Sequence, residues 1–133
     1  IKREGYYDLE IVDTLLSKSS DTELFPITFM FIRVRMGDRY FSRDAIFRNM
    51  DFIKGSMGKN HVTAELSKGY FVVIMYKTDL AAAEKTREEM LSKWEAFSKG
   101  AELETVLREV VSTENPRNTF YHEKDRLLDL ANW

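Results

Sequence analysis

Apolar and polar residues alternate along the chain with two different periods, one typical of helices and one typical of strands. Four segments have apolar residues at helical spacing and are predicted helices: 6–17, 43–57, 79–99 and 120–131. Three segments rich in aromatic and β-branched residues are predicted strands: 27–36, 61–66 and 70–76. Between the last two strands, Ser67-Lys68-Gly69 predicts a hairpin with a three-residue turn and a left-handed Gly69.

Residues 102–111 fit two structures. The apolar residues from Leu103 to Val110 have helical spacing, whereas the β-branched end and the Ser-Thr-Glu-Asn-Pro sequence that follows favour a strand. We predict a strand for this segment.

Residues near the ends of the predicted helices support their positions. Asp8 and Ser42 favour helix starts, and Thr78 is the expected N-cap of the helix after it. Gly100 is expected to end that same helix. The final helix is expected to bury three leucines: Leu127, Leu128 and Leu130.

After the first helix, the order of elements is strand, helix, strand, strand, helix, strand, followed by one more helix. This βαββαβ order is the split βαβ pattern and predicts one α/β (α+β) domain over residues 1–133. The usual solution is an antiparallel or mixed sheet with helices packed on one face. Residues 71–75 are apolar throughout, as expected of a central strand covered by helices, whereas Arg33 and Arg35 indicate that the far end of 27–36 is half exposed.

The composition excludes several classes of partner and chemistry. Of the 133 residues, 44% are apolar, which is enough to bury a core, and the 20 basic and 22 acidic side chains are interspersed and sum to −2. We therefore expect no nucleic-acid or anionic-lipid partner. The chain has no cysteine, which excludes disulfides and thiolate nucleophiles, and no apolar stretch of about 20 residues that would cross a bilayer.

The absence of cysteine is compatible with a cytoplasmic location, which we expect. The sequence begins at Ile1 without an initiator methionine, and Ile-Lys-Arg-Glu resembles no signal peptide. We therefore expect a piece of a longer polypeptide, whose remainder could attach the protein to a membrane.

Isolated reactive side chains give no catalytic motif. His61 and His122 lack nearby cysteines or paired carboxylates and are interpreted as structural or surface residues, so no metal site or cofactor is predicted. Three cations could bind a phosphate or a carboxylate, although solvated side chains at a strand end are the simpler interpretation: Arg33, Arg35 and Lys68. Trp133 or its neighbours could mark an interface or a junction to missing sequence.

The hairpin and the start of the helix after it resemble one known family. The sequence from His61 to Leu80 is similar to the signature hairpin of GGDEF domains, the diguanylate cyclases of bacteria. In that family a short strand enters the Gly-Gly-Asp-Glu-Phe turn, a hydrophobic strand leaves it, and a Thr-Asp-Leu cap opens an Ala/Glu-rich helix, as Thr78-Asp79-Leu80 does here. The resemblance covers most of the chain.

The resemblance implies that the catalytic signature is degenerate. Five residues occupy the signature turn: Ser67, Lys68, Gly69, Tyr70 and Phe71. Only the final phenylalanine of the signature is retained. Active members use the first two glycines for close approach to the nucleotide and the two acids for metal binding and activation of the attacking hydroxyl. Here Gly69 and Tyr70 take the places of those acids.

Other family sites are also altered. The metal-binding aspartate at the end of the first strand corresponds to Arg33 or, with a small shift, to Arg35, and a cation there would repel Mg²⁺. The residues that read guanine have no clear counterparts in 36–44. The inhibitory Arg-x-x-Asp site aligns with Gly58-Lys59-Asn60-His61, so both of its ligand residues are replaced.

Taken with the resemblance, the sequence predicts a degenerate GGDEF-like domain that is not an enzyme. The predicted role is regulation or protein interaction inside a larger bacterial signalling or secretion protein, with adjacent domains, another protein or a second copy as partner. The alternative is a receptor for cyclic di-GMP or GTP that uses a non-standard site around Arg33, Arg35 and Lys68. Residual cyclase or other phosphoryl-transfer activity is a third hypothesis, which the replaced acids disfavour.

Overall fold

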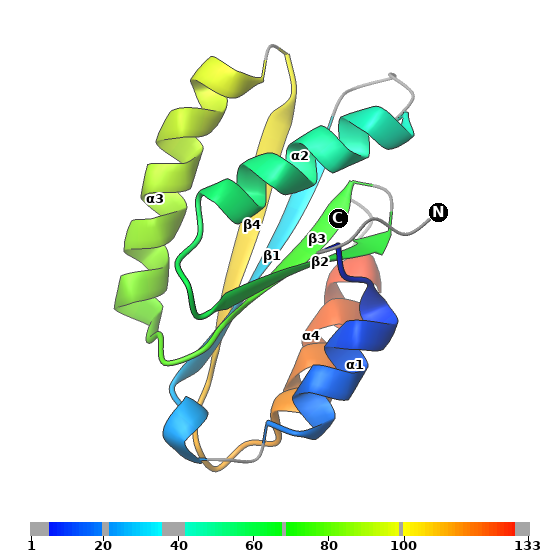
Figure 1. Ribbon diagram of the computed structural model, residues 1–133. Coiled ribbons are helices and arrows are strands. Elements are labelled where there is room, and N and C mark those ends of the chain that lie inside the picture. The colour runs from blue at the N-terminus through cyan, green and yellow to red at the C-terminus, as the bar shows by residue number, and fades with distance from the viewer. Residues whose placement is uncertain (1–5, 20–21, 36–41, 68, 99, 130–133) are drawn as a thin grey trace.

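The computed structural model describes residues 6–19, 22–35, 42–67, 69–98 and 100–129. These residues form four α-helices, four strands and a short 3-10 helix, Thr22–Leu24 (Figure 1). The helices are α1 (Leu9–Ser17), α2 (Arg43–Gly55), α3 (Leu80–Phe97) and α4 (Pro116–Asp129). The strands are β1 (Ile27–Arg35), β2 (His61–Ser67), β3 (Tyr70–Met75) and β4 (Glu102–Val110).

The four strands form one sheet in the order β2-β3-β1-β4, and each neighbouring pair is antiparallel. This arrangement confirms the predicted βαββαβ order and the strand assigned to the ambiguous segment after Gly100. Strand β1 lies inside the sheet and pairs with β3 on one side and β4 on the other. At the outer edge of β2, Tyr7 adds a parallel bridge to Ala64.

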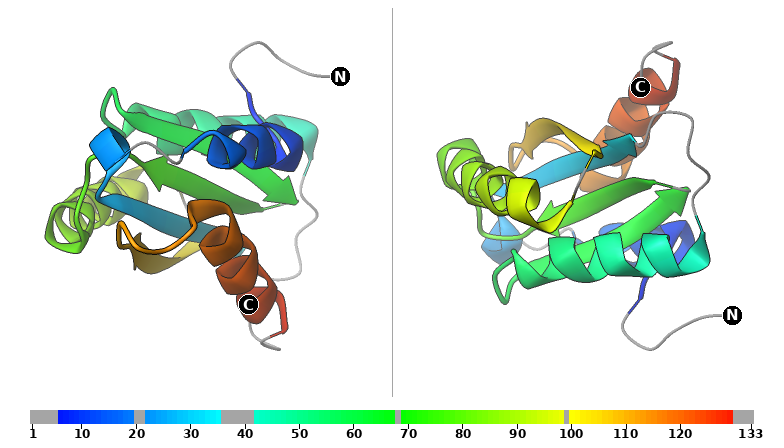
Figure 2. Two further views of the ribbon diagram at one scale, coloured as in Figure 1. Left: turned by 90° about the horizontal axis from the view of Figure 1, so that it is seen from below. Right: turned by 90° about the horizontal axis from the view of Figure 1, so that it is seen from above.

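Helices cover both faces of the sheet, so the expectation that they pack on one face is wrong. Helices α2 and α3 lie over one face, and α1 and α4 lie over the other (Figures 1 and 2). The reason is the composition of the inner strands, because β1 buries Phe29 and Phe31 toward α1 and α4, and Met30 and Ile32 toward α2 and α3. A strand that is apolar on both faces needs a cover on each.

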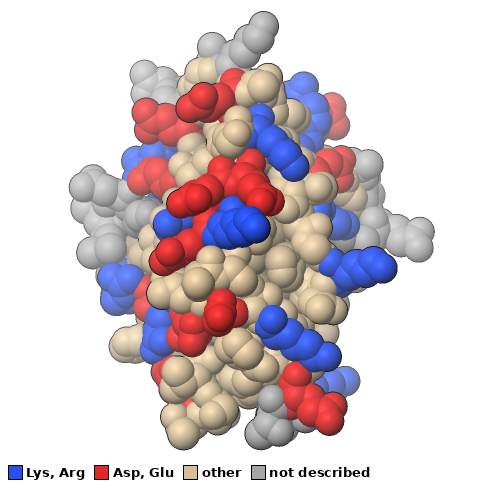
Figure 3. Space-filling model, turned by 90° about the vertical axis from the view of Figure 1, so that its left-hand side faces the viewer, with Lys and Arg blue, Asp and Glu red and all other residues tan. Residues whose placement is uncertain are grey.

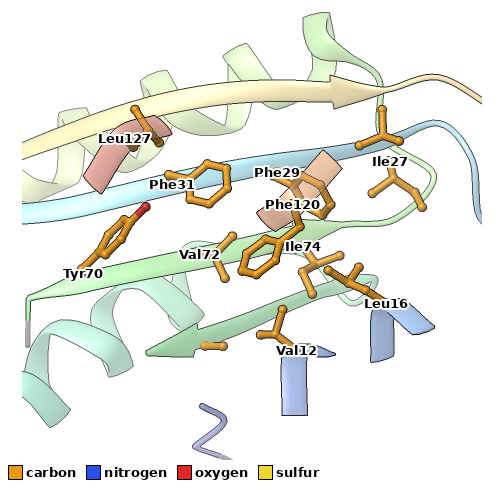
Figure 4. Close-up of a cluster of buried hydrophobic side chains, with 12 residues drawn as sticks. Val12, Leu16, Ile27, Phe29, Phe31, Tyr70, Val72, Ile74, Phe120 and Leu127 are labelled. Atoms are coloured by element: carbon orange, nitrogen blue, oxygen red, sulfur yellow. The ribbon is translucent and has the colours of Figure 1, made fainter. Parts of the chain in front are cut away.

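The core between the sheet and α4 is aromatic. Phe120 of α4 is fully buried and lies stacked against Phe31, with ring centroids 5.8 Å apart. Its ring also meets Phe29 edge to face at 5.7 Å (Figure 4). On the opposite face, Met90 and Trp94 of α3 are buried against the even-numbered residues of β1.

Local side-chain contacts start two of the helices as predicted. The Asp8 carboxylate accepts the Ile11 N–H at 3.2 Å, and the Ser42 hydroxyl accepts the Ala45 N–H at 3.1 Å. Helix α3 ends at Phe97 with Ser98 as its C-cap, so Gly100 does not end the helix as predicted. Its φ of +87° is a left-handed conformation in the connection to β4.

Helix α3 is capped by a different residue from the one predicted. The Asp79 carboxylate accepts the Ala82 N–H at 2.9 Å, so Asp79 is the N-cap. Thr78 is buried, and its hydroxyl donates to the Tyr76 carbonyl at 2.8 Å. Both residue types favour caps, and packing assigns the buried position to the threonine and the exposed one to the aspartate.

Helix α4 begins four residues earlier than predicted. Pro116 occupies its first position, where the missing N–H costs nothing, and the Asn115 side chain accepts the Asn118 N–H at 3.1 Å. Leu127 is buried as expected, whereas Leu128 is 51% exposed and that part of the prediction is wrong. The third leucine, Leu130, lies outside the described residues.

Two surface properties agree with the composition. Acidic and basic side chains are intermixed on the face seen in Figure 3. Within the described ranges, no helix is long and apolar enough to cross a membrane.

The aromatic contact between α4 and the sheet gives a stability prediction. Substitution of Phe120 by alanine should lower the free energy of unfolding by about 3–5 kcal/mol, because it removes a fully buried ring and leaves a cavity. Urea denaturation followed by circular dichroism measures the loss. Phe97→Ala is the matched control, since the Phe97 ring is 44% exposed and should cost clearly less. Equal losses in the two variants would contradict the packing described here.

Candidate functional site

The turn between β2 and β3 is held against the end of β1. Strand β2 extends to Ser67, which pairs with Tyr70, so Ser67 belongs to the strand and not to the predicted three-residue turn. Gly69 has a φ of +73°, as predicted. The Gly69 carbonyl accepts the Val34 N–H at 2.7 Å, which fixes the turn beside the last residues of β1.

Two residues that the resemblance assigns to metal-binding positions meet across this sheet. Arg33 of β1 and Tyr70 of β3 are direct partners in the antiparallel register. Tyr70 is 3% exposed, and burial is the largest cause of a raised pKa for its hydroxyl, which therefore stays protonated at neutral pH. Among the described residues, Arg33 makes no hydrogen bond or ion pair. A cation and a neutral phenol thus face one another here.

The second arginine of the strand end is already paired. Arg35 forms an ion pair with Glu104 of β4, and both side chains are about one-third exposed. Because neighbouring residues of β1 alternate between faces, Arg33 and Arg35 share the face that α4 covers. The structure therefore brings together two of the three predicted anion-binding cations, although Glu104 neutralises one of them. Lys68, the third cation, lies outside the described residues.

Helix α4 places an acidic residue beside Tyr70 that the sequence analysis did not single out. Glu123 is 6% exposed and pairs with Arg126 one turn later. Its charge contributes, after burial, to the raised pKa of Tyr70. The available signal was its spacing, because Glu123 lies three residues after Phe120 and four before Leu127, on the buried face of the helix.

The positions that correspond to the inhibitory site form a tight turn. Gly58 donates its N–H to His61 Nδ1 at 3.0 Å, and His61 Nε2 lies 3.4 Å from the Thr78 hydroxyl. Burial lowers the pKa of His61. These contacts agree with the structural interpretation of His61, and His122 lies exposed on α4.

A shallow hollow of about 380 Å³ opens beside the signature turn, between the starts of α1 and α2. Its lining residues are Asp8, Leu9, Glu10, Arg43, Glu65, Leu66 and Ser67. Arg43 and Glu65 form a bidentate ion pair across it, with both N···O distances 3.0 Å. The sequence analysis missed this pair because 22 residues separate its members and no local pattern connects them. With three carboxylates and one guanidinium, the hollow is net acidic and does not suit a phosphate group.

The described residues offer no set of metal ligands. Among the described residues, no group of three or more histidine, aspartate or glutamate side chains is placed to hold a metal ion.

Comparisons with known proteins identify the fold. No protein-family profile matches this sequence, and no curated protein sequence matches it either. The GGDEF domain of FimX from Pseudomonas aeruginosa superposes with a TM-score of 0.74 at 12% identity, covering 94% of this chain and 89% of that chain. The GGDEF domain of YfiN, also called TpbB, from the same bacterium gives 0.69 at 14% identity, with coverages of 90% and 85%.

A third similar structure is the diguanylate cyclase SiaD of Pseudomonas aeruginosa in complex with its activator SiaC. It matches with a TM-score of 0.71 at 10% identity, over 92% of this chain and 54% of that chain. At such low identities these likenesses establish the fold and nothing further. The chain has the fold of GGDEF domains, as the resemblance of its hairpin implied.

The half-buried position of His61 predicts a pH dependence of stability. Its pKa lies below the ordinary value of 6.5 in the folded chain, so the unfolded chain binds more protons as the pH falls below that value. Stability should therefore be full above about pH 6.5 and decline below it. His61→Gln should flatten this decline, as measured by urea denaturation at a series of pH values. His122→Gln, at the surface of α4, is the matched control; the same flattening in that variant would assign the effect elsewhere.

Proposed function

We propose that this domain is a catalytically inactive GGDEF-like module that regulates or binds other proteins within a larger bacterial signalling or secretion protein. The observation that carries the proposal is the pairing of Arg33 with Tyr70 across β1 and β3. In the family that the hairpin resembles, acids at these places hold the metal and activate the attacking hydroxyl.

The physical argument is electrostatic. A divalent cation needs oxygen ligands with negative charge, and phosphoryl transfer between nucleotides depends on such a cation. A guanidinium repels the cation, and a buried phenol with a raised pKa contributes no charge. Ser67 and Lys68, in place of the two glycines, add side chains where the family brings its backbone close to the nucleotide.

The rest of the scaffold supports an interaction role. Both faces of the sheet are fully packed, so the fold does not depend on an intact catalytic site. SiaD is bound to a protein activator in its solved structure, which is a precedent for protein partners of a GGDEF-containing chain. We place the module in the cytoplasm, next to further domains of its own polypeptide, with a separate protein or a second copy as the other partners.

The first consequence is the absence of turnover. Purified domain incubated with GTP and Mg²⁺ or Mn²⁺ should form no cyclic di-GMP, as followed by chromatography of the nucleotides. An active diguanylate cyclase run in parallel is the positive control. Product formation that disappears in an Arg33→Glu or Tyr70→Phe variant prepared identically would overturn the proposed inactivity.

A second candidate function is nucleotide binding without turnover. The observation that favours it is the Arg33 guanidinium, which has no hydrogen bond or ion pair to another described residue. Calorimetric titration with cyclic di-GMP, and separately with GTP and Mg²⁺, distinguishes the two candidates. The interaction module should bind neither nucleotide. A receptor would bind one of them and lose it in Arg33→Glu, while the matched charge reversal Arg48→Glu on the exposed side of α2 would leave binding intact.

A further inference from the structure

Strand β4 is an open margin of the sheet. Among the described residues it pairs with β1 on one side and has no strand on the other. All nine of its residues, from Glu102 to Val110, continue the antiparallel register without a bulge. Long, regular edge strands of this kind present unpaired backbone groups and are templates for pairing with another chain.

The direction of each backbone group in β4 follows from the register. The Val34 N–H bonds to the Gly69 carbonyl, so even-numbered residues of β1 point their backbone groups toward β3 and odd-numbered ones toward β4. The β4 partners of odd-numbered β1 residues are even-numbered, as in the pair of Phe31 with Val106. The residues of β4 that point their backbone groups outward are therefore Leu103, Thr105, Leu107 and Glu109.

One end of this margin is closed by side chains. The Glu109 carbonyl accepts a hydrogen bond from the Arg108 guanidinium, and the Val111 N–H donates to Glu114 at 3.1 Å. The outward backbone groups of the remaining three residues have no partner among the described residues: Leu103, Thr105 and Leu107. The open stretch is thus short and centred on Thr105.

We propose that β4 pairs with β4 of a second copy, antiparallel and with the two-fold axis at Thr105. This register uses the three open residues and no others. On the α3 face it sets Leu103 opposite the partner's Leu107, and Thr105 opposite the partner's Thr105. On the α4 face, Glu102 lies opposite the partner's Arg108, so symmetry creates two such charge pairs.

The charge pattern is what favours a second copy as the occupant. Glu102 and Arg108 lie three residues from Thr105 in opposite directions, so these two charges are complementary when the strand is reversed. Arg108 is already paired with Glu114 at 2.8 Å, and the partner's Glu102 would be a second carboxylate beside the same guanidinium. Glu102 is exposed and makes no ion pair among the described residues. A register centred on Val106 also sets Glu104 opposite the partner's Arg108, but Glu104 is already paired with Arg35. That register also sets Leu103 opposite the partner's Glu109 and needs the carbonyl that Arg108 already occupies.

The two flanking helices lie over the faces of the sheet on either side of β4. In the views along the sheet, α3 and α4 lie over opposite faces and β4 forms one margin between them (Figure 2). The second copy would add its strand in the plane of the sheet, and the two sheets would become one. The proposal does not depend on the state of the signature turn, so it stands or falls separately from the proposed inactivity.

A single introduced cysteine tests the position of the two-fold axis. The chain contains no cysteine, so Thr105→Cys has one possible intermolecular partner, the same residue of the second copy. Opposed residues of an antiparallel pair lie within reach of a disulfide. Mild oxidation of the full chain should therefore convert Thr105→Cys to a covalent dimer, as seen on non-reducing gels. Glu88→Cys, at the exposed surface of α3, is the matched control and should stay monomeric.

Sedimentation measures the same association without a cross-link. The wild type should show a monomer–dimer equilibrium, and Glu102→Arg should weaken it about tenfold, because both charge pairs become repulsive. Glu88→Arg makes the same change of charge elsewhere and should leave the dimer constant unchanged. Thr105→Pro removes an outward N–H without breaking the ladder to β1, so the variant should stay folded by circular dichroism and lose the dimer.

Several outcomes would overturn the proposal. A wild type that sediments as a monomer at every concentration would exclude the β4 dimer. A dimer that survives Thr105→Pro in a folded variant, or equal cross-linking of Cys variants at positions 105 and 88, would place the contact on another surface.

Discussion

The burial of β1 on all four sides is the constraint on which the rest of the structure depends. The strand is hydrogen bonded along both edges and covered on both faces, so every backbone group and every side chain from Ile27 to Ile32 lies away from water. Such a strand is stable only if its side chains are apolar in both directions and if a helix layer covers each of them. The placing of α1 and α4 opposite α2 and α3 follows from this requirement.

The last residues of β1 are no longer buried on both faces, and the candidate site lies there. The strand changes from continuous burial to alternation at Arg33, where one face remains packed and the other can carry charge. Charged residues can be exchanged at this point without disturbing the core, since the hydrogen bonds to β3 and β4 continue through them. A scaffold of this kind can keep its fold after its catalytic residues have been replaced.

The sequence predicted those parts of the fold that depend on local pattern. The hydrophobic periods located the four helices, and aromatic and β-branched content located the strands. The apolar spacing of 102–111 fitted a helix, and its β-branched end decided for the strand that the structure has. The hairpin glycine had the expected conformation. The wrong predictions concern features that depend on how the helices pack on the sheet. The number of covered faces depends on where α1 and α4 dock, and the exposure of Leu128 depends on the rotation of α4 about its axis.

The candidate site was predictable only in part for the same reason. Gly69 and Tyr70 could be found from the hairpin pattern, and Arg33 from its place at the end of the first predicted strand. Glu123 and the pair of Arg43 with Glu65 come from distant segments, and the chain gives no local sign that they meet. Burial of a glutamate becomes visible only once the face of α4 that packs on the sheet is known.

The two margins of the sheet differ in how they are protected, and this difference bears on where a partner can bind. At the β2 margin the chain supplies its own cover, since the Tyr7 carbonyl accepts the Glu65 N–H at 2.9 Å and Tyr6 is hydrogen bonded to Asp51 of α2. Nothing comparable lies along β4 in the described residues. An open strand edge pairs with strands of other chains unless its side chains prevent the approach. The charges along β4 therefore influence whether this edge attracts or repels a second copy. Repulsion would be served best by charges of one sign. Strand β4 carries three glutamates and one arginine, and Arg108 lies as far from Thr105 on one side as Glu102 does on the other.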